Sequence, residues 1–225
     1  MALQSWALSH IGGRESQEDS YFEASVGETG LYVVADGMGG HLHGAQASAQ
    51  LTANARALWE RGYLQQPDTT LAQASDCFFT LFKDTNAQLL QMSQGLTDRC
   101  GTTASLLFIK GNQFCVAHVG DSRIYVLTKK LLRSHMAQLS VDHVNAQGQL
   151  TSALGMSKKY RVFTASDNLD QLSRFLLCSD GLTNAVSVGD MKNLLTKGDE
   201  PAEQLVRQAL HNQATDNVSA LVVSV

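Results

Sequence analysis

Residues 33–41 read VVADGMGGH, an apolar run that stops at Asp36 and continues into a glycine-rich turn. The stretch 30–37, GLYVVADG, has the length and the aliphatic content of a buried strand. A carboxylate at the buried end of a strand costs several kcal/mol of desolvation unless a counter-charge or a metal ion neutralises it. The fold around this stretch must therefore supply a positive charge to Asp36.

The composition is that of a globular chain without a strongly charged partner surface. Its 225 residues are 44% hydrophobic, with 2 prolines and no evident linker. The 17 basic and 21 acidic residues are scattered, which disfavours nucleic-acid and anionic-lipid partners. No stretch approaches the ~18 apolar residues of a membrane span, and the N-terminus lacks the features of a signal peptide. We expect one domain over residues 1–225, monomeric and cytoplasmic, with reduced cysteines because none has C-x-x-C spacing.

Hydrophobic periodicity predicts an α+β domain. Long helices are expected over 43–61 and 69–93, and two short helices within 187–213, the second with Pro201 in its first turn and Asp199 as its cap. Strands are expected at 30–37, 102–109, 113–119, 123–127, 160–166, 174–182 and 217–225. The turns at 110–112 and 120–122 predict a meander of three hairpin-connected strands. Strands and helices in separate runs favour layered, mostly antiparallel sheets.

Acidic residues recur where apolar runs begin or end. Asp36 and Asp180 each end a run, Asp216 precedes a third, and Glu18 and Asp19 lie together in RESQEDS, residues 14–20. No lysine or arginine lies within nine residues of Asp36 or within eight of Asp216. A shared divalent cation would neutralise these groups. Oxygen ligands without a histidine or cysteine set favour Mg²⁺ or Mn²⁺ over Zn²⁺.

Each acidic position also has an ordinary structural interpretation. An Asp-Gly pair after a strand is usually only a turn, Asp216 with Asn217 can be a strand-entry turn, and Glu18 with Asp19 can be a solvated face. The joint occurrence of these positions, with Arg14 nearby, favours a site.

Seven motifs resemble, in order, those of the protein phosphatase 2C family, the metal-dependent serine/threonine phosphatases, in their compact bacterial form. They are RESQEDS (14–20), VVADGMGGH (33–41), DRCGTTAS (98–105), VAHVGDSRIY (116–125), LTSALG (150–155), LLCSDGL (176–182) and TDNVSALVV (215–223). The resemblance implies a four-layer αββα sandwich, with two antiparallel sheets flanked by helix pairs and a metal cleft at one end of the sheets. It also implies hydrolysis of phosphoserine and phosphothreonine in proteins that a serine/threonine kinase has phosphorylated.

The same resemblance assigns roles to individual residues. Asp36 is expected to bridge two Mn²⁺ or Mg²⁺ ions that activate a water molecule, and Arg14 to grip the phosphate. The remaining ligands would be Asp180 and Asp216 for one ion, and Glu18 with the Gly37 carbonyl for the other. Asp19 and Asn217 are expected to support these ligands from behind. The resemblance further points to Asp98 with Asp180 for a third ion, and to a structural role for Asp121.

Three departures from the family pattern stand out. Gln17 replaces the usual asparagine, and Met38 stands where animal members carry a histidine proposed as general acid, which leaves His41 or a metal-bound water for that role. Only VNAQGQ, residues 144–149, separates VDH from LTSALG, so the family's flap subdomain is nearly absent. We therefore expect shallow selectivity for the residues around the phosphate.

The same residues bear on other classes of function. No cysteine is followed by the arginine that a cysteine-based tyrosine phosphatase requires. The alternatives left open are a phosphoprotein-binding module without turnover and a partner-switching regulator. The sequence does not select the phosphoprotein or the pathway, and a setting such as type VI secretion is one option among several.

Overall fold

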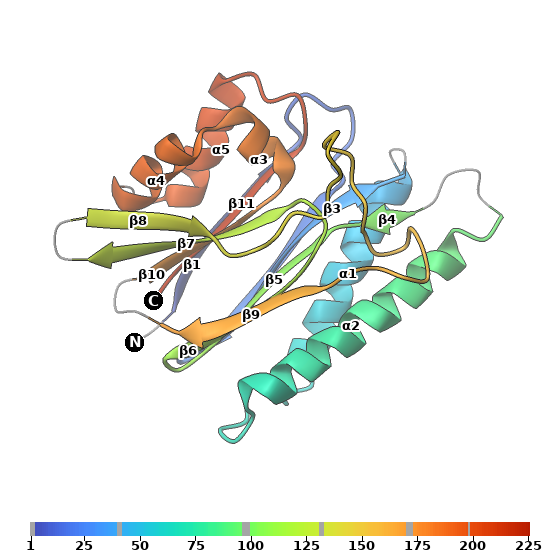
Figure 1. The fold of residues 1–225 in the computed structure, drawn as a ribbon, viewed down its shortest axis with the longest axis horizontal. Coiled ribbons are helices and arrows are strands. Elements are labelled where there is room, and N and C mark those ends of the chain that lie inside the picture. The colour runs from blue at the N-terminus through green and yellow to red at the C-terminus, as the bar shows by residue number, and fades with distance from the viewer. Residues whose placement is uncertain (1–2, 40–41, 96–99, 131–132, 170–172, 198) are drawn as a thin grey trace.

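Two antiparallel sheets packed face to face form the centre of the fold (Figure 1). The computed structural model describes residues 3–39, 42–95, 100–130, 133–169, 173–197 and 199–225. Sheet A has the strand order β1 (Gln4–His10), β11 (Val218–Ser224), β10 (Ser173–Cys178), β7 (Arg123–Lys130) and β8 (Arg133–Gln138). Sheet B has the order β2 (Asp19–Val26), β3 (Thr29–Met38), β5 (Ala104–Lys110), β6 (Gln113–Val119) and β9 (Phe163–Asn168), with β4 (Gly101–Thr102) paired to the end of β3.

Helices cover the outer face of each sheet. Sheet B carries the long pair α1 (Leu42–Glu60) and α2 (Leu71–Met92), and sheet A carries α3 (Asp180–Ala185), α4 (Val188–Lys197) and α5 (Pro201–His211) (Figure 1). The layer order is therefore α, β, β, α, which confirms the predicted sandwich. Where a second helix pair was expected, sheet A is covered by three helices.

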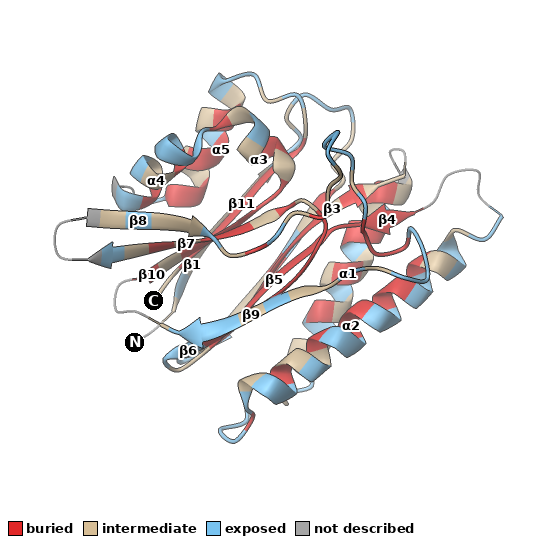
Figure 2. Ribbon diagram, in the orientation of Figure 1, coloured by how far each residue is buried: buried red, intermediate tan, exposed pale blue. Residues whose placement is uncertain are grey.

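The core has three layers, one between the sheets and one between each sheet and its helices. Figure 2 shows that the central strands are largely buried, whereas β9 at the edge of sheet B is mostly exposed. Strand β3 alternates between two of these layers: Tyr32 and Val34 face sheet A, and Leu31 and Val33 face α1 and α2. All four side chains are fully buried. The continuous apolar run at 31–35 thus reflects a strand with helices on one side and a second sheet on the other.

Most predicted elements are confirmed to within a few residues. The helices expected over 43–61 and 69–93 are α1 and α2, and the strand expected at 113–119 is β6. Three strands, β1, β2 and β8, were not predicted. All three lie at sheet edges, where a strand has a partner on one side only.

The predicted hairpin at 120–122 is wrong. Strand β6 belongs to sheet B, whereas β7 pairs with β10 and β8 in sheet A. The turn between them therefore crosses from one sheet to the other. Gly120 permits the crossing because its φ is +116°, and a Cβ there would lie 2.6 Å from a methyl carbon of Thr103.

Two further details differ from expectation. The strand expected at 174–182 ends at Cys178, and Asp180 is the first residue of α3. Pro201 does occupy the first turn of α5, but the N-cap is Glu200 and not Asp199, and it makes no side-chain capping bond.

The segment between β8 and β9 contains no helix or strand and only two isolated bridges, Thr102–Leu154 and Val144–Leu150. This short connection is consistent with the near absence of the flap subdomain that the sequence predicts. Over the ranges given above, no helix combines the length and apolarity needed to cross a bilayer.

Candidate active site

A cleft of about 350 Å³ opens where the ends of both sheets meet. It is lined by Arg14, Glu18, Asp36, Gly37, Met38, Gly39, Thr103, Asp121, Leu150, Asp180, Asp216 and Asn217. Segments far apart in the sequence thus contribute to one cavity. Seven of these residues were predicted from the sequence to bind a cation or the phosphate or to support such a ligand.

Asp36 and Asp19 are direct neighbours across β3 and β2. The main chain of Asp36 is fixed by Thr103, whose hydroxyl accepts from the Asp36 N–H at 2.9 Å and whose own N–H donates to the Asp36 carbonyl at 2.8 Å. Burial raises the pKa of the Asp36 carboxyl well above its usual range, and the nearby Asp19 and Asp180 raise it further. Asp36 therefore lies in a concentration of negative charge.

Asp19 lies behind the cleft and links the two sheets. Its side chain is buried, and its Oδ2 accepts hydrogen bonds from the hydroxyls of Ser179 and Ser219, both at 2.7 Å. Its Oδ1 has no hydrogen-bond partner among the described residues. Burial raises the Asp19 pKa to about 6 although the two hydroxyls oppose the shift. A buried carboxylate with an unsatisfied oxygen favours a further positive or hydrogen-donating group beside it.

Asp180 and Asp121 approach the cleft from sheet A and from the crossing turn. Asp180 accepts a hydrogen bond from Asn184 Nδ2, one turn further along α3, at 3.2 Å. The pKa of Asp180 is raised mainly by burial and secondly by the charge of Asp216. The pKa of Asp121 is raised to about 6, mainly by burial and secondly by the charge of Asp180. The crossing turn thus brings a carboxylate to the cleft for which the sequence predicted only a structural role.

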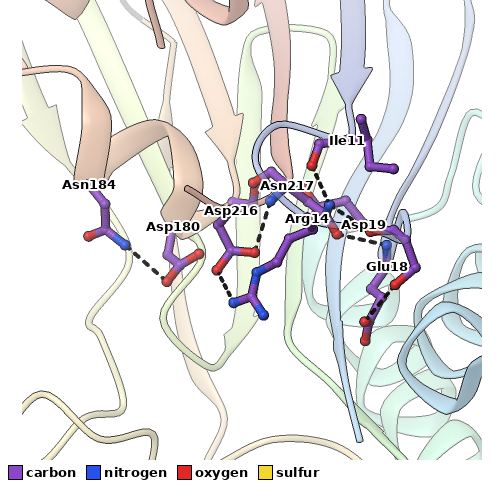
Figure 3. Close-up of polar contacts among 10 residues, drawn as sticks. Ile11, Arg14, Glu18, Asp19, Asp180, Asn184, Asp216 and Asn217 are labelled. Atoms are coloured by element: carbon purple, nitrogen blue, oxygen red, sulfur yellow. Dashed lines mark hydrogen bonds and ion pairs between the residues drawn. The ribbon is translucent and has the colours of Figure 1, made fainter. Parts of the chain in front are cut away.

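Asn217 holds the loop that carries Arg14 and Glu18 (Figure 3). Its Nδ2 donates to the carbonyls of Ile11 and Ser16, at 2.8 and 2.9 Å, and its Oδ1 accepts from the Glu18 N–H at 2.8 Å. One side chain therefore fixes both ends of residues 11–18 against β11.

Arg14 points into the same cleft from this loop and forms an ion pair with Asp216. Its Nη2 lies 2.6 Å from Asp216 Oδ2, and this hydrogen bond raises the arginine pKa. The Arg14 side chain is 57% exposed. The guanidinium can therefore reach a ligand that enters from solvent.

Close contacts at glycines bring Glu18 against the start of α1. A Cβ on Gly37 would lie 2.0 Å from the Gly44 carbonyl oxygen, and a Cβ on Gly44 would lie 1.8 Å from Glu18 Oε2. The Gly37 N–H also donates to the Glu18 carbonyl at 3.1 Å. Gly37 has no room for a side chain against the Gly44 backbone, and a side chain at Gly44 would displace the Glu18 carboxylate, so Gly44 packs against the site although no motif indicated it.

The cleft offers oxygen donors suited to Mg²⁺ or Mn²⁺. No three His, Cys, Asp or Glu side chains in the described ranges are already gathered as a closed metal-binding group. The side chains of Asp216, Asp180 and Glu18 are instead turned toward Arg14, Asn184 and Ser16. The donor types and the unsatisfied Asp19 oxygen fit divalent cations. Asp98 and His41, the candidates for a third ion and for the general acid, lie outside the described residues.

The sequence missed several groups that shape the cleft. Asp121 was assigned to a hairpin, and Leu150 was noted only as part of a motif. Ser179 and Ser219 lie in the LLCSDGL and TDNVSALVV motifs, but their contact with Asp19 had no signal, because that residue is 160 and 200 residues away. The position of Asp121 could have been found only by recognising that the turn crosses between sheets.

Comparisons with known proteins agree with this geometry. The family model described as protein phosphatase 2C matches residues 8–221. The protein phosphatase PhpP of Streptococcus pneumoniae is 27% identical over 240 aligned residues, covering 96% of this chain and 95% of its own length. The structure of PppA superposes on this chain with a TM-score of 0.86 at 27% identity, covering 100% of this chain and 99% of that one. PppA is described as a key regulatory component of the type VI secretion system in Pseudomonas aeruginosa.

A third relative carries metal ions. The catalytic domain of the serine/threonine protein phosphatase PstP, solved in complex with 2 manganese ions, superposes with a TM-score of 0.80 at 27% identity, covering 99% of this chain and 97% of that one. The family match extends over nearly the whole chain and includes every strand that brings an acidic residue to the cleft. The chain therefore belongs to the protein phosphatase 2C family of metal-dependent serine/threonine phosphatases.

Proposed function

We propose that this chain hydrolyses phosphoserine and phosphothreonine in other proteins with two divalent cations, Mn²⁺ or Mg²⁺, and that it reverses a serine/threonine kinase. The proposal is for one catalytic domain over residues 1–225 that acts as a cytoplasmic monomer on phosphoproteins. The observation that carries it is the convergence of four acidic residues and Arg14 on one cleft: Glu18, Asp36, Asp180 and Asp216. Carboxylates for cations and a guanidinium for phosphate are the groups that metal-assisted hydrolysis of a phosphate ester uses.

The proposed cation ligands follow from the positions of these groups. Asp36 would be shared by both ions, with Asp180 and Asp216 on one side and Glu18 with the Gly37 carbonyl on the other. When bound, the two ions activate a water molecule for attack on phosphorus and neutralise the phosphate oxygens. The raised pKa of Asp36 supports this assignment because a cation offsets repulsion among clustered carboxylates. A third ion at Asp98 and Asp180 stays a prediction.

Residues of the chain then bind and orient the phosphate. Arg14 offers a planar fork that matches two phosphate oxygens, and its ion pair with Asp216 keeps it at the cleft. Asn217 prevents the Arg14 loop from moving away. Asp19, held by two serine hydroxyls, would support the cation ligands from behind the cleft, with Oδ1 available to accept a further hydrogen bond.

The cysteines do not supply an alternative nucleophile. Burial raises the pKa of Cys115 to about 11 and that of Cys178 to about 12, and neither residue lines the cleft. A thiol with so high a pKa holds its proton at neutral pH and is a poor nucleophile.

The test is release of inorganic phosphate from a phosphothreonine peptide. We expect release with Mn²⁺ or Mg²⁺, loss of release in excess EDTA, restoration by added metal, and little effect of cysteine alkylation. Binding of the peptide without phosphate release in any metal would favour the binding module and would overturn the proposal. Inactivation by alkylation would contradict it in a second way.

A further inference from the structure

The short connection that stands in place of the flap is built as a small, self-braced loop. We call residues 143–151 the braced loop. Asn145 shapes it: its Oδ1 accepts from the N–H groups of Gln147 and Gln149, at 3.0 and 2.9 Å, and its carbonyl accepts from the Gly148 N–H at 2.9 Å. Gly148 turns the chain with a φ of +75°. A bridge between Val144 and Leu150 closes the loop.

The base of the braced loop is held by His143 and Thr151. The Thr151 N–H and hydroxyl both donate to the His143 carbonyl, at 2.7 and 2.8 Å. Arg161 Nη2 donates to the same Thr151 hydroxyl at 2.7 Å. The two ends of the loop are therefore tied together, and Arg161 supports this base from outside the loop.

His143 also fixes the loop to the turn that crosses between the sheets. Its N–H donates to the Gly120 carbonyl at 2.7 Å, and its Nδ1 accepts from the Gly120 N–H at 3.1 Å. His118 Nε2 lies 3.0 Å from the same carbonyl. Both histidines are buried. The braced loop is thus anchored beside Asp121, at the edge of the cleft.

This anchoring gives Leu150 a defined place in the cleft wall. Among the described residues that line the cleft, Met38 and Leu150 have the apolar side chains, and the others are charged, polar or glycine. Leu150 is half-buried and so retains surface for a ligand. A substrate whose phosphate lies among the acidic residues must place a flanking residue near one of the cleft walls.

We propose that Leu150 determines specificity by contacting a residue next to the phosphoserine or phosphothreonine, and that it favours an apolar one. His143 is the positioning residue that holds Leu150 at the cleft through Gly120. The inference rests on the proposed function and adds a substrate class to it: phosphoproteins with an apolar residue beside the phosphorylated one. Because the contact is open to solvent, we expect a preference of about fivefold in kcat/KM, the effect of burying about one methylene or slightly more.

Two phosphothreonine peptides test the proposal. In one peptide leucine flanks the phosphothreonine on both sides, in the other serine does, and the two are otherwise identical. The measured quantity is the ratio of their kcat/KM values, which does not depend on the fraction of folded enzyme. We expect the ratio to fall from about five to about one in Leu150→Ala and to persist in Leu150→Met, since methionine fills a similar volume. Val141→Ala, at a residue that is 54% exposed and does not line the cleft, is the matched control and keeps the ratio.

The role of His143 is tested by a pair of variants. His143→Leu removes the acceptor for the Gly120 N–H and should lower the ratio toward that of Leu150→Ala. His143→Asn offers Oδ1 in place of Nδ1 and should restore it, a rescue that loss of stability alone would not produce. A wild-type ratio near one, or an unchanged ratio in Leu150→Ala, overturns this inference alone. Failure of the wild type to release phosphate from either peptide with Mn²⁺ overturns it together with the proposed function.

Discussion

Removing the side chain of Asn217 should destabilise the protein and loosen the loop that carries Arg14. In Asn217→Ala, the carbonyls of Ile11 and Ser16 and the N–H of Glu18 each lose a hydrogen bond of 2.8–2.9 Å. Each neutral hydrogen bond contributes about 0.5–1.5 kcal/mol. The three together predict a loss of about 2–4 kcal/mol in the free energy of unfolding.

Urea denaturation followed by circular dichroism measures this loss. At about 2–4 °C per kcal/mol for a chain of this size, the melting temperature should fall by roughly 4–16 °C. The total stability of a domain is about 5–15 kcal/mol, so the variant should still fold. Phosphatase activity should fall as well, because Arg14 and the Glu18 backbone lose their shared anchor.

Two companion variants separate the contributions of the side chain. Asn217→Asp keeps an acceptor for the Glu18 N–H but loses both donors, so its stability should lie between those of the wild type and Asn217→Ala. Asn112→Ala, at an exposed asparagine in the β5–β6 turn, should change the free energy of unfolding by less than about 0.5 kcal/mol. A loss below about 1 kcal/mol in Asn217→Ala would refute the view that this residue anchors the loop.

Three further predictions concern the cleft and the buried histidine. Asp36→Asn should lower kcat by about a thousandfold without unfolding the chain, because it removes the charge shared by both cations; activity within about tenfold of the wild type in a Mn²⁺ assay would contradict the metal assignment. Arg14→Ala should lower kcat/KM by about ten- to a hundredfold for a phosphopeptide and for a small aryl phosphate, with Arg14→Lys intermediate, and equal kinetics for all three proteins would exclude the phosphate fork. Burial lowers the pKa of His118 to about 4, so below about pH 6.5 the unfolded chain binds a proton that the folded chain does not, and His118 contributes a loss of stability as the pH falls toward 4. Carboxyls with raised pKa values stabilise the fold at low pH, so the test compares the wild type with His118→Gln by urea denaturation at pH 7 and pH 4.5. The difference between the unfolding free energies of the two proteins should narrow by roughly 2–3 kcal/mol at the lower pH. Parallel pH profiles of the two proteins would refute this role of His118.

The sequence revealed Asp36, Asp180 and Asp216 as candidate site residues because they stand at the ends of strongly apolar runs. Asp36 lies near the end of β3 and Asp216 shortly before β11, and most residues of both strands are buried. The three strands that were missed, β1, β2 and β8, are edge strands. In β1 none of the residues is fully buried, so the alternation between apolar and polar positions that identifies a strand is weak there.

The part of the site that could not be predicted depends on long-range packing. A Gly-Asp-Ser turn is compatible both with a hairpin and with a crossing between sheets, and only the pairing of β7 with β10 decides between them. The crossing places Asp121, which was expected to have a structural role in a hairpin turn, in the wall of the cleft. The serine hydroxyls on Asp19 come from β11 and from the N-terminus of α3, and no local pattern records such a contact.

The position of β11 has a consequence for when the site can exist during folding. Sheet A places this strand between β1 and β10, and the two residues before it, Asp216 and Asn217, complete the cleft and secure the Arg14 loop. Contacts of such long sequence separation form late and slowly, since the intervening chain must first be ordered. A nascent chain that ends before residue 216 therefore has neither group. We therefore expect the site to assemble late, and phosphatase activity to appear with the completed sheet rather than gradually.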